Sequence, residues 1–204
     1  MHAGSGNVRI IGGRWRGTRL AVVDAPGLRP TADRVRETVF NWLMPMLPGA
    51  RVLDLFAGSG ALGLEALSRG ASEALLVERD PALAQSLRQA GERLQAAQGV
   101  HVVQADALQW LRVPLHGRFD LVFLDPPFDA GLWPEALALL SPWLADDAWL
   151  YLESPIAAEV TPGPGWSLHR EGRTRETRYA LYRRAVAAAV TLPADFNAHG
   201  AATE

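Results

Sequence analysis

One ten-residue stretch decides the fold of this chain: Asp54-Leu55-Phe56-Ala57-Gly58-Ser59-Gly60-Ala61-Leu62-Gly63. Its glycines form the pattern Gly-x-Gly-x-x-Gly between an apolar segment typical of a buried strand, Arg51–Phe56, and a predicted helix, Ala61–Arg69. Glycines at a strand-to-helix turn permit a tight bend and let a ligand approach the backbone. The stretch therefore predicts a Rossmann-like unit that binds a nucleotide-like cofactor, and the pattern alone would also allow a dinucleotide.

The segments that follow alternate between strand and helix. Short apolar strands are predicted at 74–77, 100–103, 119–124 and 149–152, with a helix that begins at Asp80-Pro81 and another over Trp133–Leu140. This alternation indicates an α/β fold with a doubly wound, mostly parallel sheet. The last two strands, Trp166–Arg170 and Tyr179–Arg183, are predicted to form an antiparallel hairpin.

The N-terminal part has a different pattern. Predicted strands at 8–11 and 19–23 flank a glycine-rich connection, Gly12–Gly17, which favours a β-hairpin. Thr31 is a suitable N-cap for a helix that ends before Pro45 and whose apolar stripe consists of Val35, Val39, Trp42 and Leu43. We therefore expect an N-terminal hairpin arm over 1–30, a Rossmann-like domain over 31–184 and a flexible, Ala-rich tail over 185–204.

Acidic residues follow three predicted parallel strands and indicate which cofactor binds. A carboxylate at Asp54 would repel a pyrophosphate and favours a ligand with an ammonium and a sulfonium, such as S-adenosylmethionine. Glu78 can accept hydrogen bonds from a ribose diol, and Asp106 can meet an adenine amino group. The predicted cofactor-binding residues are Asp54, Phe56, Gly58, Gly60, Glu78 and Asp106.

The segment after the strand at 119–124 indicates the reaction. It reads Asp125-Pro126-Pro127-Phe128, and its prolines turn the backbone out of the sheet at the ligand edge. Acceptors at Asp125 and the Pro126 carbonyl can hold an exocyclic amine as it attacks a sulfonium methyl, while Phe128 can stack on a flipped base. We predict these four residues to be catalytic, without an obligate general base. The acceptor-only carboxylate favours guanine weakly over adenine.

Charge is distributed unevenly behind a net charge of −2. Residues 1–51 carry eight arginines against three acids, residues 52–165 six against fifteen, and residues 166–184 six against two; no lysine occurs. Basic ends around an acidic middle indicate a polyanionic partner. The chain has no cysteine, no apolar run of the ~18–20 residues that span a bilayer, and no metal-ligand cluster. We expect a cytoplasmic monomer without a signal peptide, membrane association or metal.

The chain resembles the small, single-domain bacterial 16S ribosomal RNA guanine-N2 methyltransferases over residues 8–184. Four segments carry the resemblance in order: Gly12–Gly17, Arg29-Pro30-Thr31 through Arg36–Asn41, Asp54–Gly60 and Asp125–Phe128. Many amino-methyltransferases share the segments Asp54–Gly60 and Asp125–Phe128. The segment from Arg29 to Asn41 occurs in far fewer families and therefore carries the substrate assignment. The resemblance implies the Rossmann-like fold of class I methyltransferases, with S-adenosylmethionine as donor and S-adenosylhomocysteine as product. It also implies a guanine of 16S rRNA, within the small ribosomal subunit, as acceptor.

Arginines near an aromatic residue support an RNA partner, because their planar forks bind phosphates and the ring can stack on a base. The predicted RNA-binding residues are Arg14, Trp15, Arg16, Arg29, Arg34 and Arg36. Arg173, Arg175 and Arg178 are weaker candidates. Arg34 or Glu37 could instead tie the helix to the active-site loop.

Other functions are compatible with parts of the pattern. The same core could methylate adenine N6 in DNA or a protein glutamine amide, although a target-recognition domain is missing and the basic ends suit RNA. A nicotinamide-dependent reductase is disfavoured because the Asp54 carboxylate would repel the pyrophosphate of its cofactor. An RNA-binding assembly factor without turnover would not need the intact motifs at 54–63 and 125–128.

Overall fold

A seven-stranded sheet forms the centre of the computed structural model, which describes residues 7–21, 33–96, 98–113 and 117–185. Its strand order is β5-β4-β3-β6-β7-β9-β8, with β3 to β7 parallel and the last two strands antiparallel. The strands are β3 (Arg51–Asp54), β4 (Glu73–Glu78), β5 (Val100–Gln104), β6 (Phe119–Leu124), β7 (Leu144–Pro155), β8 (Trp166–Arg173) and β9 (Thr177–Arg184). The predicted mixed α/β sheet with a C-terminal hairpin is confirmed.

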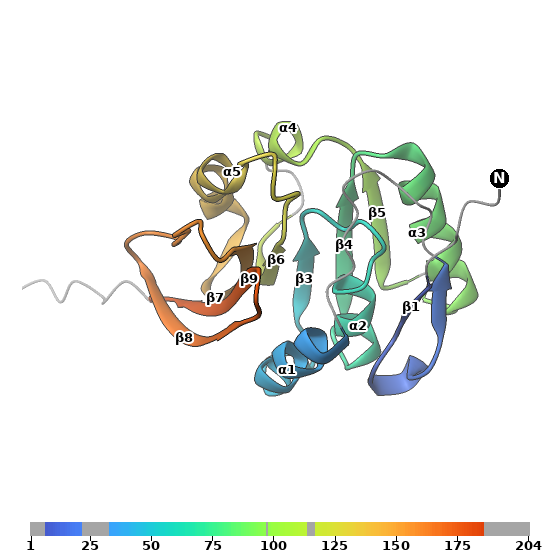
Figure 1. Cartoon of the computed structure of the whole chain (residues 1–204). Helices are drawn as coiled ribbons and strands as arrows, with labels where there is room; N and C mark the ends of the chain where they lie inside the picture. The colour runs from blue at the N-terminus through green and yellow to red at the C-terminus, as the bar shows by residue number, and fades with distance from the viewer. Residues whose placement is uncertain (1–6, 22–32, 97, 114–116, 186–204) are drawn as a thin grey trace, which may run out of the picture.

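Helices cover both faces of this sheet (Figure 1). One buried cluster joins a face of the strands to α1 (Asp33–Leu43), α2 (Gly63–Ser68) and α3 (Pro81–Arg93). A second cluster joins the opposite face to α4 (Ala107–Leu111), α5 (Trp133–Leu140) and the 3-10 helix η2 (Ser141–Trp143). This three-layer arrangement directs all the parallel strands toward one edge, where a ligand can bind.

Local sequence explains where the helices begin. Asp80 caps α3, as predicted, and its carboxylate accepts hydrogen bonds from the backbone N–H groups of Ala82 and Leu83 at 2.8 and 3.0 Å. In α1 the predicted stripe is buried at Val35, Val39 and Leu43. The predicted cap of α1, Thr31, lies outside the described residues.

Some boundaries differ from the predictions. The turn begins at Leu55, so the strand predicted over 51–56 ends at Asp54. β7 extends well beyond the predicted 149–152, and its first half carries exposed Asp146 and Asp147 that conceal the strand pattern. α4 was not predicted because five residues are too few to show helical periodicity.

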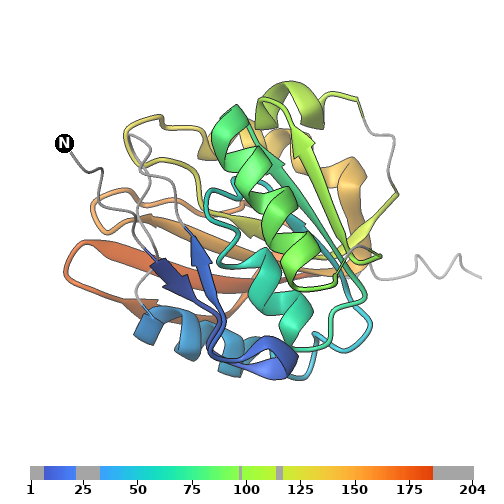
Figure 2. The ribbon, with the colours of Figure 1, turned by 90° about the vertical axis from the view of Figure 1, so that its right-hand side faces the viewer.

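The N-terminal hairpin packs against the helices. It consists of β1 (Asn7–Arg9), the 3-10 helix η1 (Gly13–Trp15) and β2 (Arg19–Ala21), and Figure 2 shows it beside α2 and α3. Ser68 of α2 fixes it by donating to the Gly12 carbonyl at 2.6 Å and accepting from the Trp15 N–H at 3.0 Å. The boundary predicted at residue 30 and nearly all of the predicted tail lie outside the described residues.

Candidate active site

A cavity of about 570 Å³ opens at the carboxyl ends of the parallel strands. The glycine loop, the ends of β4 and β6 and the β8–β9 turn all contribute to its lining. It contains most of the residues predicted from sequence: Asp54, Phe56, Gly58, Glu78, Asp106, Asp125, Pro126, Pro127 and Phe128. Gly60 is absent from the lining and packs instead against α2 and α3.

Four carboxylates follow adjacent strands along this edge: Glu78 on β4, Asp54 on β3, Asp125 after β6 and Glu153 on β7. Side chains alternate between the two faces of a strand, and the residues two positions earlier belong to the cluster beneath α1, α2 and α3. All four acids therefore continue the same face of the sheet. All four also line the cavity.

Asp54 lies at the base of the cavity and is only 2% exposed. Its Oδ2 accepts a hydrogen bond from the backbone N–H of Gly63, 3.0 Å away. Burial raises the pKa of the Asp54 carboxyl from 3.8 to about 7; the hydrogen bond from Gly63 opposes that rise and the negative charge of Glu78 adds to it. A cationic ligand would stabilise the ionised form.

Glu78 shapes the loop from the neighbouring strand. Its two oxygens accept hydrogen bonds from the backbone N–H groups of Gly58 and Asp80, each at 2.8 Å. Each carboxylate oxygen has a second lone pair, so Glu78 can still bind a ribose diol. The same side chain thus orders the glycine loop and faces the cavity.

Two glycines in the loop are required by close packing. Gly60 has a φ of +75°, and a Cβ there would lie 2.6 Å from Leu87 Cδ2. At Gly63 a Cβ would collide with Leu76 of β4. Larger side chains would therefore push the start of α2 away from the sheet and move the N–H group that binds Asp54.

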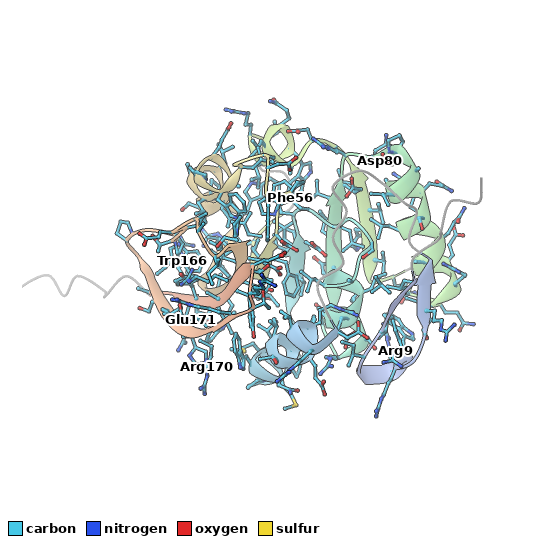
Figure 3. The ribbon with its side chains drawn as sticks, viewed as in Figure 1. Arg9, Phe56, Asp80, Trp166, Arg170 and Glu171 are labelled. Carbon is cyan, nitrogen blue, oxygen red and sulfur yellow. The ribbon has the colours of Figure 1, made fainter. Side chains whose placement is uncertain are left out.

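The adenine end of the predicted site is formed by Phe56 and Asp106. Phe56 is half-buried, and Figure 3 shows it near the middle of the molecule, with Asp80 near the start of α3. Asp106 caps α4 by accepting a hydrogen bond from the Gln109 N–H at 3.0 Å. The cap fixes its carboxylate while the residue still lines the cavity.

The Asp125–Phe128 segment leaves the sheet immediately after β6, as its prolines predict. Pro126 is buried and the other three residues are half-buried. The ring of Phe128 lies 6.1 Å from that of Trp133 at the start of α5. The segment is therefore packed on one side and borders the cavity on the other.

Sequence reasoning missed Glu153, Thr174 and Thr177, which also line the cavity. Glu153 is 7% exposed, and its Oε2 accepts a hydrogen bond from the Tyr151 hydroxyl at 2.7 Å. It stands directly after the strand predicted at 149–152, so the rule applied to Asp54 and Glu78 could have found it. The two threonines lie in the β8–β9 turn and at the start of β9. Short-range sequence patterns do not predict that this turn reaches the cavity.

The cavity fits a cofactor such as S-adenosylmethionine. Buried Asp54 suits positive charge, Glu78 suits a ribose diol, and Phe56 beside Asp106 suits a heterocycle with an amino group. A pyrophosphate would meet the carboxylates of Asp54 and Glu78 at the same loop. The two carboxylates therefore make a dinucleotide a poor ligand for this Gly-x-Gly-x-x-Gly loop.

Comparisons with known proteins agree with this geometry. The family model described as "Conserved hypothetical protein 95" matches residues 8–183. The Escherichia coli (strain K12) protein named "Ribosomal RNA small subunit methyltransferase D" is 50% identical over 90% of this chain and 93% of its own length. The chain belongs to this family. The resemblance stated from sequence motifs is thus confirmed.

Further relatives extend the match. A Haemophilus influenzae protein of the same name is 42% identical over 87% of this chain and 94% of its own length. The solved structure of the Escherichia coli protein yhhF superposes with a TM-score of 0.81 at 46% identity, and the match covers 89% of this chain and all of that one. These family members therefore share both sequence and fold with this chain along nearly its whole described length.

The predicted RNA-binding residues occupy different environments. Arg14 and Arg16 are exposed at the tip of the N-terminal hairpin, and the Arg14 guanidinium lies 4.0 Å from the ring centre of half-buried Trp15. Arg34 is exposed on α1. Arg29 lies outside the described residues. Of the weaker candidates, Arg178 pairs with Glu171 at 2.9 Å.

Arg36 requires a correction, because only 1% of it is exposed. Its Nη2 donates to the Arg9 carbonyl at 3.0 Å and to Asp33 at 2.6 Å, and its Nη1 lies 3.9 Å from Glu65. Such a side chain does not reach a phosphate on the surface. Its position argues for a role in joining the hairpin, α1 and α2.

Within the described ranges, no group of three or more His, Cys, Asp or Glu could hold a metal ion. Among the same residues, no helix is long and apolar enough to cross a membrane.

Proposed function

We propose that this chain transfers a methyl group from S-adenosylmethionine to the exocyclic N2 amine of one guanine in small-subunit ribosomal RNA. The observation that carries this proposal is one cavity lined by both the acidic glycine loop and the Asp125–Phe128 segment. Family membership supports the RNA substrate, since the curated relatives are named as ribosomal RNA small subunit methyltransferases.

The cofactor-binding residues would act mainly through charge and position. Asp54, Glu78 and Asp106 would hold the cationic, phosphate-free cofactor against the glycine loop, with Phe56 beside its heterocycle. When bound, S-adenosylmethionine supplies an activated methyl group. In-line positioning then contributes most of the expected rate enhancement, because the leaving sulfur is already activated.

The Asp125–Phe128 segment would hold the acceptor. Asp125 and the Pro126 carbonyl accept hydrogen bonds from the amine and stabilise the positive charge that develops on its nitrogen. The ring of Phe128 provides a surface for the flipped base. The amine loses its extra proton to water after transfer, so none of these residues needs to act as a base.

The decisive experiment is transfer of a tritiated methyl group to small ribosomal subunits and to naked small-subunit rRNA. Nucleoside analysis and mapping of the labelled position would identify the base, the atom and the preferred substrate. Labelled N2-methylguanosine at a single position is the expected product. N6-methyladenosine would establish the alternative that the motifs leave open, and no transfer to either RNA would contradict the proposal.

A further inference from the structure

The four strand-end carboxylates divide into two pairs. Glu78 and Asp54 both bind backbone N–H groups of the glycine loop, at Gly58 and Gly63. Asp125 follows β6 and Glu153 lies near the end of β7, and the register of these two strands pairs Leu124 with Leu152. The residues after this pair therefore lie side by side at the edge of the sheet. In the proposed function, the first pair faces the cofactor and the second lies at the acceptor end.

Glu153 is held by groups that sequence reasoning did not identify. The Tyr151 hydroxyl, buried beneath it, donates to its Oε2 at 2.7 Å. Burial raises the pKa of Tyr151 well above its usual value, and the nearby carboxylates of Glu153 and Asp125 add to the rise. Thr174 and Thr177 of the β8–β9 turn close the same end of the cavity. This environment fixes Glu153 without removing it from the cavity.

Two neighbouring carboxylates match only one kind of base edge. Guanine presents N1–H and the N2 amine side by side, so two acceptor-only groups can each receive a hydrogen bond. Adenine places the unprotonated N1 next to its N6 amine. A carboxylate facing that position would meet the lone pair of adenine N1 and repel it, which is costly in a desolvated site.

We propose that Glu153 accepts a hydrogen bond from N1–H of the target guanine, beside Asp125 at the N2 amine, and thereby selects guanine over adenine. This inference rests on the proposed function. It assigns a specificity-determining role to a residue outside both sequence motifs.

The test deletes the hydrogen-bond donor from the base and the acceptor from the protein. The RNA, assembled from synthetic strands into small subunits, carries guanine, 2-aminopurine or adenine at the mapped position. 2-Aminopurine keeps the 2-amine but lacks N1–H. We expect wild-type kcat/KM to fall about 10- to 100-fold on 2-aminopurine. Glu153→Ala should lower kcat/KM on guanine and reduce the guanine-to-2-aminopurine ratio about tenfold.

Controls separate this role from a structural one. Glu159→Ala removes an exposed glutamate and should leave the ratio unchanged. S-adenosylmethionine affinity, measured by calorimetry, should stay within about twofold in Glu153→Ala. The Glu153→Ala, Tyr151→Phe double variant avoids an unpaired buried hydroxyl and should show the same altered ratio if the single variant folds poorly.

Four results would overturn the inference. If Glu153→Ala lowered kcat/KM equally on guanine and on 2-aminopurine, Glu153 would only support the fold. A wild-type guanine-to-2-aminopurine ratio in the double variant would show the same. A wild-type protein that methylates 2-aminopurine as fast as guanine would show that N1–H is not read. A wild-type protein that leaves guanine unmodified would instead refute the proposed function, and this inference with it.

Discussion

The cavity and the N-terminal hairpin hold charges of opposite sign in opposite environments. Asp54 and Glu78 are 2% and 9% exposed, whereas Arg14 and Arg16 lie in solvent. Figure 3 shows Arg9 on this hairpin and Arg170 on the C-terminal hairpin, at opposite sides of the central strands. Buried acids interact strongly with a small ligand at short range, while exposed arginines attract a large polyanion at longer range and are screened by salt.

The two regions meet in a buried ionic cluster. Glu65 of α2 is fully buried and accepts hydrogen bonds from the Ile11 and Gly12 N–H groups of the hairpin at 2.7 and 2.8 Å. Arg69 donates to it at 2.7 Å, and Arg36 lies 3.9 Å away. Since α2 begins at the glycine loop, this cluster connects the hairpin to the cofactor side of the cavity.

The largest expected effect comes from Asp125. Asp125→Ala should lower the rate of methyl transfer about 10³-fold, because it removes the acceptor for the amine in the transition state. The cofactor dissociation constant should stay within a few-fold, since the glycine loop is untouched. Tritium transfer and calorimetry measure the two quantities. Asp129→Ala, at an exposed position nearby, is the matched control, and an active Asp125→Ala protein would remove Asp125 from the catalytic residues.

The ionic cluster that joins the two regions is tested through stability. Glu65→Ala leaves two hairpin N–H groups and the Arg69 guanidinium without their acceptor and removes the negative charge 3.9 Å from buried Arg36. We therefore expect the free energy of unfolding to fall by about 3–5 kcal/mol. Urea unfolding measures the change. Glu92→Ala on the exposed face of α3 should change it by less than about 0.5 kcal/mol. A similar small change for Glu65→Ala would show that the hairpin does not depend on this cluster.

Within the cavity, Glu78 should control affinity more than rate. Glu78→Ala removes the acceptor proposed for the ribose diol and frees the Gly58 N–H, so the S-adenosylmethionine dissociation constant should rise about 10- to 100-fold. The rate at saturating cofactor should change far less. Calorimetry and saturation kinetics separate the two effects, and an unchanged dissociation constant would exclude Glu78 from the cofactor site.

The predictability of the two regions differs for a physical reason. The glycine pattern, the Asp80 cap and the two prolines of Asp125–Phe128 each lie within a few consecutive residues, so the sequence predicts these features well. The burial of Arg36 depends on a hairpin that docks through Glu65, and no short pattern distinguishes such an arginine from an exposed one. Glu153, in contrast, follows the predicted strand at 149–152 directly and is therefore detectable from the sequence by the same strand-end pattern as Asp54 and Glu78.

The titration of Asp54 gives a pH prediction for the acidic region. Its folded pKa of about 7 lies above the unfolded value of 3.8, so the native state holds more protons in this window. Stability contributed by this group therefore falls as pH rises, by about 1 kcal/mol between pH 6 and 8. Asp54→Asn should remove this contribution to the slope of unfolding free energy against pH, measured by urea unfolding of the protein without cofactor. Identical slopes in the two proteins would show that Asp54 does not titrate between pH 6 and 8 in the folded protein.

RNA binding by the basic region should depend on salt concentration, unlike cofactor binding in the cavity. Arg14→Ala with Arg16→Ala should weaken RNA binding about tenfold and reduce the slope of log affinity against log salt by about 1.5, as expected for two lost phosphate contacts. Cofactor affinity should stay unchanged. Arg112→Ala with Arg118→Ala removes the same charge from exposed positions elsewhere in the fold and is the matched control. Equal salt slopes in the two double variants would assign Arg14 and Arg16 to the solvated surface, and the RNA contact would then have to come from other basic residues, such as Arg34 on α1.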